Sequence, residues 1–252
     1  SEPLFIFLSL LSFWMFDLYI ERNYHIWLGA CATFVGLAYL TRYSGLALLA
    51  TFVVAILILK KTWREKLITS GMFIAGTLPF ILGWTIRNKL VAANSTNRSF
   101  AWHPITAENL RIGLRTVTEA LFPIDVWRKA MLKQPFLVEA IIVIVLGTIL
   151  VWLAIRAWKY LSNPEQLSSS DGRGHNTKEV ISFTTGLYIF AYLASILASM
   201  LMFDAATKFK LRILAPIFVS LLILLVYFGI WLRNKNRPLV ILLTFVLIAF
   251  SA

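Results

Sequence analysis

The sequence predicts an all-helical membrane protein, a polytopic bundle with about eight spans. Apolar residues make up 59% of its 252 residues and its mean hydropathy is +0.78, which exceeds what the mixed surface of a water-soluble domain permits. The apolar stretches lack the alternation of barrel strands, and only helices or closed barrels satisfy every backbone polar group in lipid. Basic residues gather at the ends of the stretches, where a helix leaves the hydrocarbon.

Each stretch approaches the length needed to cross a membrane. Crossing takes about 20 apolar residues, and shorter helices manage by thinning the bilayer. Only residues 41–45 separate the second and third stretches, so these two could instead form one broken helix pair, which leaves the count open by one. The predicted spans are residues 3–20, 25–41, 45–59, 69–86, 137–158, 182–203, 211–231 and 238–251.

The predicted spans divide the chain into three regions. Residues 1–86 and 137–252 would each hold about four spans, and residues 87–136 would form a long loop between them. Lys and Arg cluster after the third, fifth and seventh spans, so the positive-inside tendency assigns those ends to the cytoplasm. The long loop is then extracytoplasmic, together with the amino end and residues 41–45 and 204–212.

Two segments between the spans differ in kind. Residues 159–180 are rich in small polar side chains, which predicts a flexible cytoplasmic linker. In the outer loop, polar residues at 106–109 precede an apolar stripe with helical spacing. An amphipathic helix lying on the outer membrane surface would suit this pattern, and a solvated loop with incidental apolar residues is the alternative. The stripe consists of Ile112, Leu114, Val117 and Leu121.

Composition and motifs exclude several classes of protein. A net charge of +12 would suggest nucleic acid for a soluble chain, but these cations lie between apolar spans and indicate anionic or phosphorylated lipids. With Cys31 as the single cysteine and three histidines, neither a disulfide framework nor a metal-ligand cluster is predicted. The chain has no Gly-rich phosphate loop and no nucleophile elbow, and no cofactor is identified.

Polar residues at the predicted outer face are the candidates for chemistry. Glu2 opens the first span and could bind a hydroxyl substrate or act as a base, or it could be an interfacial acid favoured by the helix dipole. Arg42, followed by Tyr43, lies between two apolar stretches. An arginine there is costly unless it meets an anion or reaches the headgroups, and its planar fork suits phosphate.

Two further candidate groups lie later in the chain. Arg87 and Asn88 close the fourth span, which Pro79 is expected to kink. His103 could shuttle protons or bind a metal, although a lone histidine beside Trp and Pro is more often a structural hydrogen-bonding group. Three cations at the start of the seventh span alternate with apolar residues and could clamp a lipid-linked phosphate or anchor the helix in headgroups. These cations are Lys208, Lys210 and Arg212.

Four short motifs in a fixed order carry a resemblance to a known family. They are Ser-Glu-Pro-Leu-Phe at residues 1–5, Thr-Arg-Tyr-Ser-Gly at 41–45, Ile-Arg-Asn at 86–88 and Arg-Ile-Leu-Ala-Pro at 212–216. Each is weak alone, but the set resembles polytopic GT-C glycosyltransferases of the protein-mannosyltransferase-like superfamily, which includes the lipid A aminoarabinose transferases. The resemblance covers nearly the whole chain.

The resemblance implies an enzyme of the bacterial cytoplasmic membrane with an outward-facing active site. It would move a hexosyl or pentosyl group from a polyprenyl-phosphate donor to an acceptor, which could be a protein, a lipid or a glycan. The implied partners are the donor, that acceptor and membrane lipids, without nucleic acid. The donor phosphate would contact Arg212, Lys210, Lys208, Arg87 and Arg42, and the cavity would be supported by Glu2, Tyr43, Asn88 and His103.

One departure from the family affects the catalytic residue. The family's catalytic Asp lies in its first outer loop, upstream of the Ser-Glu-Pro motif, so the general base is expected upstream of Ser1 and about three spans would precede this fragment. Ile213 stands where the family more often has an aromatic residue, which leaves the adjacent cation intact. The complete protein could also use a divalent metal.

Transport is the competing class. A transporter or flippase for lipid-linked or anionic substrates would share the span count, the basic mouth, and the helix-disturbing residues Gly76, Pro79 and Gly83. Against it, the two halves of the chain do not contain matching broken helices. A non-catalytic membrane scaffold is a third possibility, but it would not need cations concentrated on the outer face.

Overall fold

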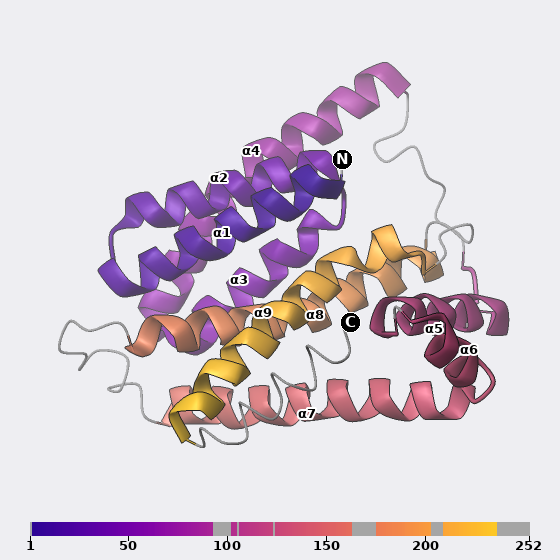
Figure 1. The fold of residues 1–252 in the computed structure, drawn as a ribbon. Coiled ribbons are helices and arrows are strands. Elements are labelled where there is room, and N and C mark those ends of the chain that lie inside the picture. The colour runs from indigo at the N-terminus through magenta and orange to yellow at the C-terminus, as the bar shows by residue number, and fades with distance from the viewer. Residues whose placement is uncertain are drawn as a thin grey trace.

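The computed structural model describes residues 2–92, 102–104, 106–122, 124–162, 175–202 and 209–235. Within these residues the chain forms nine α-helices and no strand, so the predicted all-α class is confirmed (Figure 1). The helices are α1 (Glu2–Arg22), α2 (His25–Thr41), α3 (Gly45–Leu59), α4 (Trp63–Ala92), α5 (Ala107–Leu121), α6 (Asp125–Leu132), α7 (Pro135–Ser162), α8 (His175–Met202) and α9 (Leu211–Lys235).

Seven of the eight predicted spans coincide with helices, namely α1 to α4 and α7 to α9. Five of these are long and apolar enough to cross a membrane, while α2 and α3 are apolar but shorter, at 17 and 15 residues. The eighth predicted span, residues 238–251, lies outside the described residues. The chain is therefore a helical protein suited to crossing a membrane several times, and the count of eight stays a prediction.

Residues 41–45 separate two distinct helices that fold back on each other. The turn closes through backbone hydrogen bonds from Arg42 N to Ala38 O at 3.0 Å and from Gly45 N to Arg42 O at 2.9 Å. A Cβ on Gly45 would lie 2.6 Å from the Tyr39 backbone. Glycine is thus required for α3 to start so close to the last turn of α2.

The segments between the predicted spans are shorter than the sequence suggested. Helix α4 continues to Ala92, well into the region expected to be loop. Helices α7 and α8 occupy residues 159–162 and 175–180 of the expected linker, and residues 163–174 lie outside the described part of the chain. Helix propagation past the apolar core explains the extensions, because each added residue gains a backbone hydrogen bond once a helix exists.

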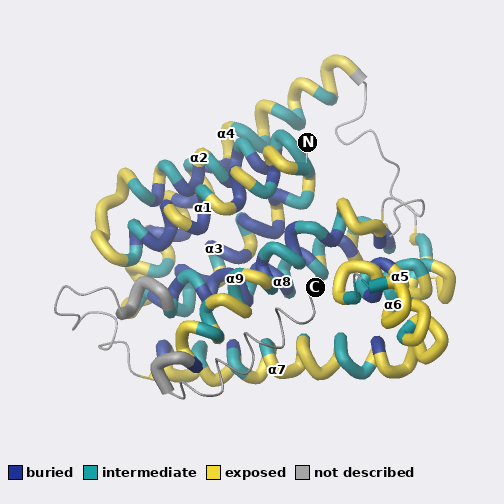
Figure 2. Tube along the Cα trace, viewed as in Figure 1, coloured by how far each residue is buried: buried dark blue, intermediate teal, exposed yellow. Residues whose placement is uncertain are grey.

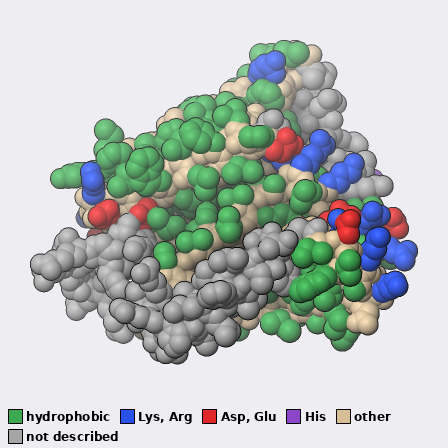
Figure 3. Space-filling model, viewed as in Figure 1, with side chains coloured by type: hydrophobic (Ala, Val, Ile, Leu, Met, Phe, Trp, Pro, Cys, Tyr) green, Lys and Arg blue, Asp and Glu red, His purple; other side chains and the backbone are tan. Residues whose placement is uncertain are grey.

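The buried core lies on the inner faces of α1, α2, α3 and α8 (Figure 2). Half of the apolar window of α1 and 56% of that of α8 are buried, against only 11% of α7. On the face seen in Figure 3, hydrophobic side chains cover the middle of the described surface and charged ones gather toward the two ends of the helices. Such a surface fits a hydrocarbon layer between two headgroup layers.

Ring contacts show that α1 and α8 run antiparallel. Phe5 lies against Tyr192, with ring centroids 6.3 Å apart, and Phe13 lies against Tyr188 at 5.4 Å. The Tyr192 hydroxyl also donates to Ile213 O at 2.9 Å. The start of α1, the end of α8 and the start of α9 therefore meet at one end of the bundle, where α5 and α6 also lie (Figure 1). We call it the α5 end.

Small residues allow α2 and α4 to pack closely, as is common where lipid offers no hydrophobic driving force. A Cβ on Gly76 would lie 2.9 Å from Ala32 Cβ, and one on Gly36 would overlap the Phe80 side chain, whose Cβ would be 3.0 Å away. Gly29, in the same helix as Gly36, has no neighbour within 4 Å of such a Cβ.

This contrast yields a stability prediction for α2. We expect Gly36→Ala to lower the free energy of unfolding by about 1–3 kcal/mol, because the added methyl group overpacks the contact with α4. Gly29→Ala, which removes a glycine from the same helix, should not lower it. Thermal unfolding in detergent can be followed with a thiol-reactive dye, since Cys31 is buried in the folded chain. Equal melting temperatures for the two variants would contradict the close packing.

Candidate functional site

The described candidate residues all lie at the α5 end of the bundle. Glu2 begins α1, and Arg42 and Tyr43 form the turn between α2 and α3. Arg87 and Asn88 lie in the last part of α4, while Lys210 and Arg212 lie at the start of α9. His103 joins them through its backbone nitrogen, which donates to Leu201 O near the end of α8 at 2.8 Å. Lys208 lies outside the described residues.

Arg42 and Glu2 form an ion pair that the sequence did not predict. Arg42 Nη1 lies 3.7 Å from Glu2 Oε1, with side chains 19% and 31% exposed. The Arg42 guanidinium lies 5.9 Å from the centre of the Phe5 ring. Arg212 is near enough to contribute a minor electrostatic interaction with Glu2. The Arg42–Glu2 pair therefore links the start of α1 to the α2–α3 turn, at the end of the bundle where α9 begins.

The Arg42 atom that faces Glu2 makes no hydrogen bond within the described residues. This Nη1 is shielded from solvent, and its carboxylate partner is 3.7 Å away, beyond hydrogen-bond distance, so the donor can still bind another group. Buried donors of this kind are rare without a ligand or water. A planar fork that carries a fixed positive charge is well suited to phosphate or carboxylate oxygens.

Tyr43 brings two of the sequence motifs together. Its hydroxyl accepts hydrogen bonds from Trp84 Nε1 at 3.1 Å and from Asn88 Nδ2 at 3.3 Å. The Arg87 guanidinium stacks over the Trp84 ring, 5.2 Å from its centre. These contacts hold the last turns of α4 against the turn that carries Arg42. Trp84 was assigned no role of its own from the sequence, although its position three residues before Arg87 places the two side by side on the helix.

Lys210 and Arg212 are presented by a firmly anchored helix start. The backbone nitrogens of Ile213 and Leu214 donate to Lys210 O at 2.9 and 3.1 Å, which closes the first turn of α9. Both basic side chains are exposed. The structure thus pairs Glu2 with Arg42 and links Tyr43 to Asn88. Three exposed cations lie at the same end of the bundle: Arg87, Lys210 and Arg212.

The α1–α8 interface carries polar side chains that the sequence analysis passed over. Tyr188 and Thr185 are 1% and 0% exposed, and Tyr188 OH and Thr185 Oγ1 have no hydrogen-bond partner among the described residues. With Tyr192 they share one stripe of α8, at spacings of three and four residues. Asp17 of α1 is likewise only 4% exposed, with Oδ1 lacking a partner in the described structure. A single acid within an apolar stretch was the signal that could have identified it.

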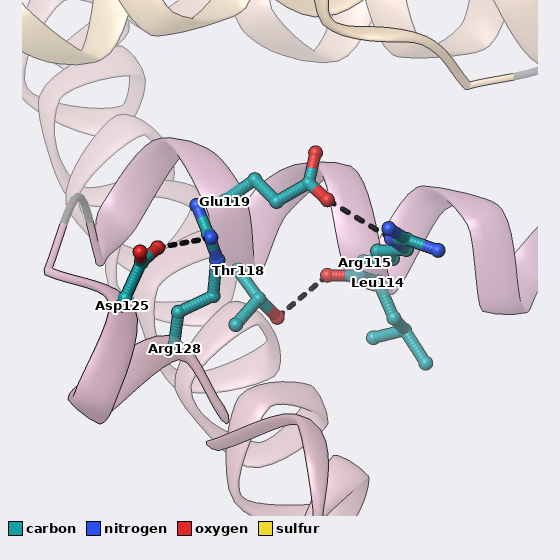
Figure 4. Close-up of polar contacts among 6 residues, drawn as sticks. All are labelled: Leu114, Arg115, Thr118, Glu119, Asp125 and Arg128. Carbon is teal, nitrogen blue, oxygen red and sulfur yellow. Dashed lines mark hydrogen bonds and ion pairs between the residues drawn. The ribbon is translucent and has the colours of Figure 1, made fainter. Parts of the chain in front are cut away.

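Helix α5 confirms the amphipathic helix predicted after residue 106. The Thr106 hydroxyl accepts from Asn109 N and so caps the first turn. Figure 4 shows Arg115 paired with Glu119, at 2.9 Å, Thr118 donating to Leu114 O at 2.7 Å, and Asp125 paired with Arg128 at the start of α6. Helix α5 contacts α9 and the residues just before it, since a Cβ on Gly113 would lie 3.2 Å from Phe209. Its position on a membrane surface stays a prediction.

The described residues hold no group of three or more His, Cys, Asp or Glu side chains that could bind a metal ion. Comparison of the chain with protein-family models, with curated proteins and with solved structures found no match. The chemistry of the candidate residues is therefore the basis for a function. They comprise a shielded arginine, a carboxylate paired with it, and exposed cations at one end of a bundle of apolar helices.

The hydrogen bonds accepted by Tyr43 yield a second prediction. Tyr43→Phe removes the hydroxyl oxygen that accepts both hydrogen bonds from α4. We expect the free energy of unfolding to fall by at most about 1 kcal/mol for each bond. Amide hydrogen exchange of residues 84–92 should become faster. Tyr24→Phe is the matched control, because Tyr24 is 65% exposed near the other end of α2. Unchanged exchange in Tyr43→Phe would show that these bonds do not hold α4 in place.

Proposed function

We propose that this chain belongs to a membrane glycosyltransferase that takes a sugar from a polyprenyl-phosphate donor and transfers it to an acceptor outside the membrane. The observation that supports this function is the meeting of distant sequence motifs at the α5 end. Glu2 pairs with Arg42 at 3.7 Å and interacts electrostatically with Arg212. The motif around residues 86–88 reaches the same turn through Tyr43.

The chemistry of donor cleavage calls for such a group of cations. As the acceptor hydroxyl attacks the anomeric carbon, the bond to the phosphate oxygen breaks through an oxocarbenium-like transition state. Polyprenyl phosphate leaves with added negative charge, which preorganised cations stabilise. Among the candidates, Arg42 has an ion-pair partner in Glu2, and Arg212 is exposed. The general base remains an expectation from the resemblance, an Asp upstream of Ser1.

The membrane setting also favours a lipid-linked donor over a soluble sugar nucleotide. A polyprenyl chain stays in hydrocarbon and holds its phosphate at headgroup depth. The candidate cations lie at helix ends, which is the level where a membrane-spanning helix meets the headgroups. A donor in the bilayer would therefore reach Arg42, Arg87 and Arg212 by lateral diffusion.

Binding of the lipid product tests this function. We expect Arg212→Ala to weaken the binding of polyprenyl phosphate to the chain in nanodiscs by about tenfold or more, because a charge-assisted contact contributes about 1.5–3 kcal/mol. Arg64→Ala is the control, since Arg64 is exposed at the opposite end of α4. Both variants should keep the melting temperature of the wild type. Equal binding by wild type and Arg212→Ala would count against a phosphate site at this end.

Transport is the second function that a specific observation favours. Asp17 is a buried acid in a helix long enough to span the membrane, and such residues often belong to proton or ion pathways. The transferase proposal needs no such residue. We therefore expect Asp17→Asn, like its exposed neighbour control Glu21→Gln, to leave polyprenyl phosphate binding unchanged. The transporter would be favoured if the wild-type chain carries substrate into liposomes without releasing polyprenyl phosphate and Asp17→Asn abolishes that uptake.

A further inference from the structure

Helix α6 is the one described helix of the outer loop that buries none of its residues in the protein. Val126 is 73% exposed and Trp127 is 45% exposed. With Ala130 and Met131 they form a continuous apolar arc, because their positions on the helix fall within less than half a turn. Helix α6 contacts α5 and α7, but much of its apolar arc stays exposed, and a short amphipathic helix gains most of its stability from covering such a face.

The helix that follows fixes the depth of this arc. Helix α7 begins at Pro135, three residues after α6 ends, and it is the least buried of the membrane-length helices. Phe136, in its first turn, is 74% exposed. If α7 spans the membrane, α6 must lie where α7 enters the hydrocarbon, at the boundary between headgroups and acyl chains.

An apolar stripe runs down α7 from that point. Its side chains recur at spacings of three, four, seven or eight residues, so they lie on one face of the helix. Their exposed fractions, between 53% and 74%, are those of a surface that meets lipid rather than protein. The stripe consists of Phe136, Val143, Ile144, Val151, Ile155 and Trp158.

Two lysines lie shortly before the first residue of this stripe. Lys129 and Lys133 are exposed and four residues apart, along one edge of the α6 apolar arc. The neighbouring Arg128 is already paired with Asp125 (Figure 4). The lysines are thus the cations of α6 that can reach an outside anion, and Lys is a common ligand for phosphate.

We propose that the junction of α6 and α7 is a binding site for a phospholipid of the surrounding membrane. Lys129 and Lys133 bind its phosphate, Val126 and Trp127 lie at the headgroup–acyl boundary, and the acyl chains follow the exposed stripe of α7. This site is separate from the Glu2–Arg42 site and does not depend on the proposed transferase activity.

The first test measures where α6 lies. A nitroxide label on Val126→Cys, in a Cys31→Ala background, is examined in phosphatidylglycerol nanodiscs with oxygen and with a water-soluble nickel reagent. We expect the label to be accessible to oxygen and protected from nickel. Accessibility to nickel would place α6 in water and overturn the proposal. Protection from both reagents would mean that protein covers the arc, which also overturns it.

The second test measures the headgroup contact. Native mass spectrometry of the full chain would count the phosphatidylglycerol molecules retained after detergent exchange. We expect the double variant Lys129→Gln and Lys133→Gln to retain about 10- to 30-fold less of the bound lipid, since each lysine near a lipid surface contributes on the order of 1 kcal/mol. Lys61→Gln with Lys89→Gln is the control with the same charge change at exposed positions. Equal retention by the two double variants would overturn the assignment of the lysines.

Discussion

The packing of α8 against α1 and α3 is the contact on which the rest of the structure depends. Helices α1 to α4 pack among themselves, and α7 and α9 pack on α8, so α8 joins the two halves of the chain. Its contacts include Tyr188 against Phe13 and Tyr192 against Phe5. Aromatic pairs of this kind combine a large buried area with a preferred geometry. Because the pairs run antiparallel, the motifs at the start of α1 and of α9 meet at one end.

Desolvation explains where the charged groups are found. An unpaired charge in hydrocarbon is costly, so membrane helices place their charges at the ends or pair them. Arg42 follows both rules, since it lies in a turn and pairs with Glu2. Lys60 behaves similarly at the opposite end of α3, where Nζ donates to Asn23 Oδ1 at 2.9 Å and lies 4.6 Å from the Tyr19 ring centre. A charge held in this way is fixed in position and can be used for binding.

The sequence predicted the helices far better than it predicted the site. Apolar stretches mark α1 to α4 and α7 to α9 because burial in lipid or in the core dominates their energetics. The pairing of Arg42 with Glu2 and of Tyr43 with Trp84 depends on how helices rotate and slide against each other, which hydropathy does not encode. Asp17 and Tyr188 escaped notice for the same reason, since only packing shows that both are buried. The prediction ended α4 too early because Arg87, Asn88 and Lys89 interrupt the apolar stretch, yet the helix continues through them to Ala92.

An ion pair joins α7 directly to α8. Arg156 Nη1 donates to Glu179 Oε2 at 2.6 Å, with both side chains partly buried. Arg156 precedes residues 163–174 in the sequence and Glu179 follows them, so the ion pair joins the two helices on either side of this connection. Together with the contact of α7 on α3, this ion pair attaches α7 to the other helices by more than the peptide that joins it to α8. We expect changes of chain length in that connection to disturb the helices less than changes within the helices themselves.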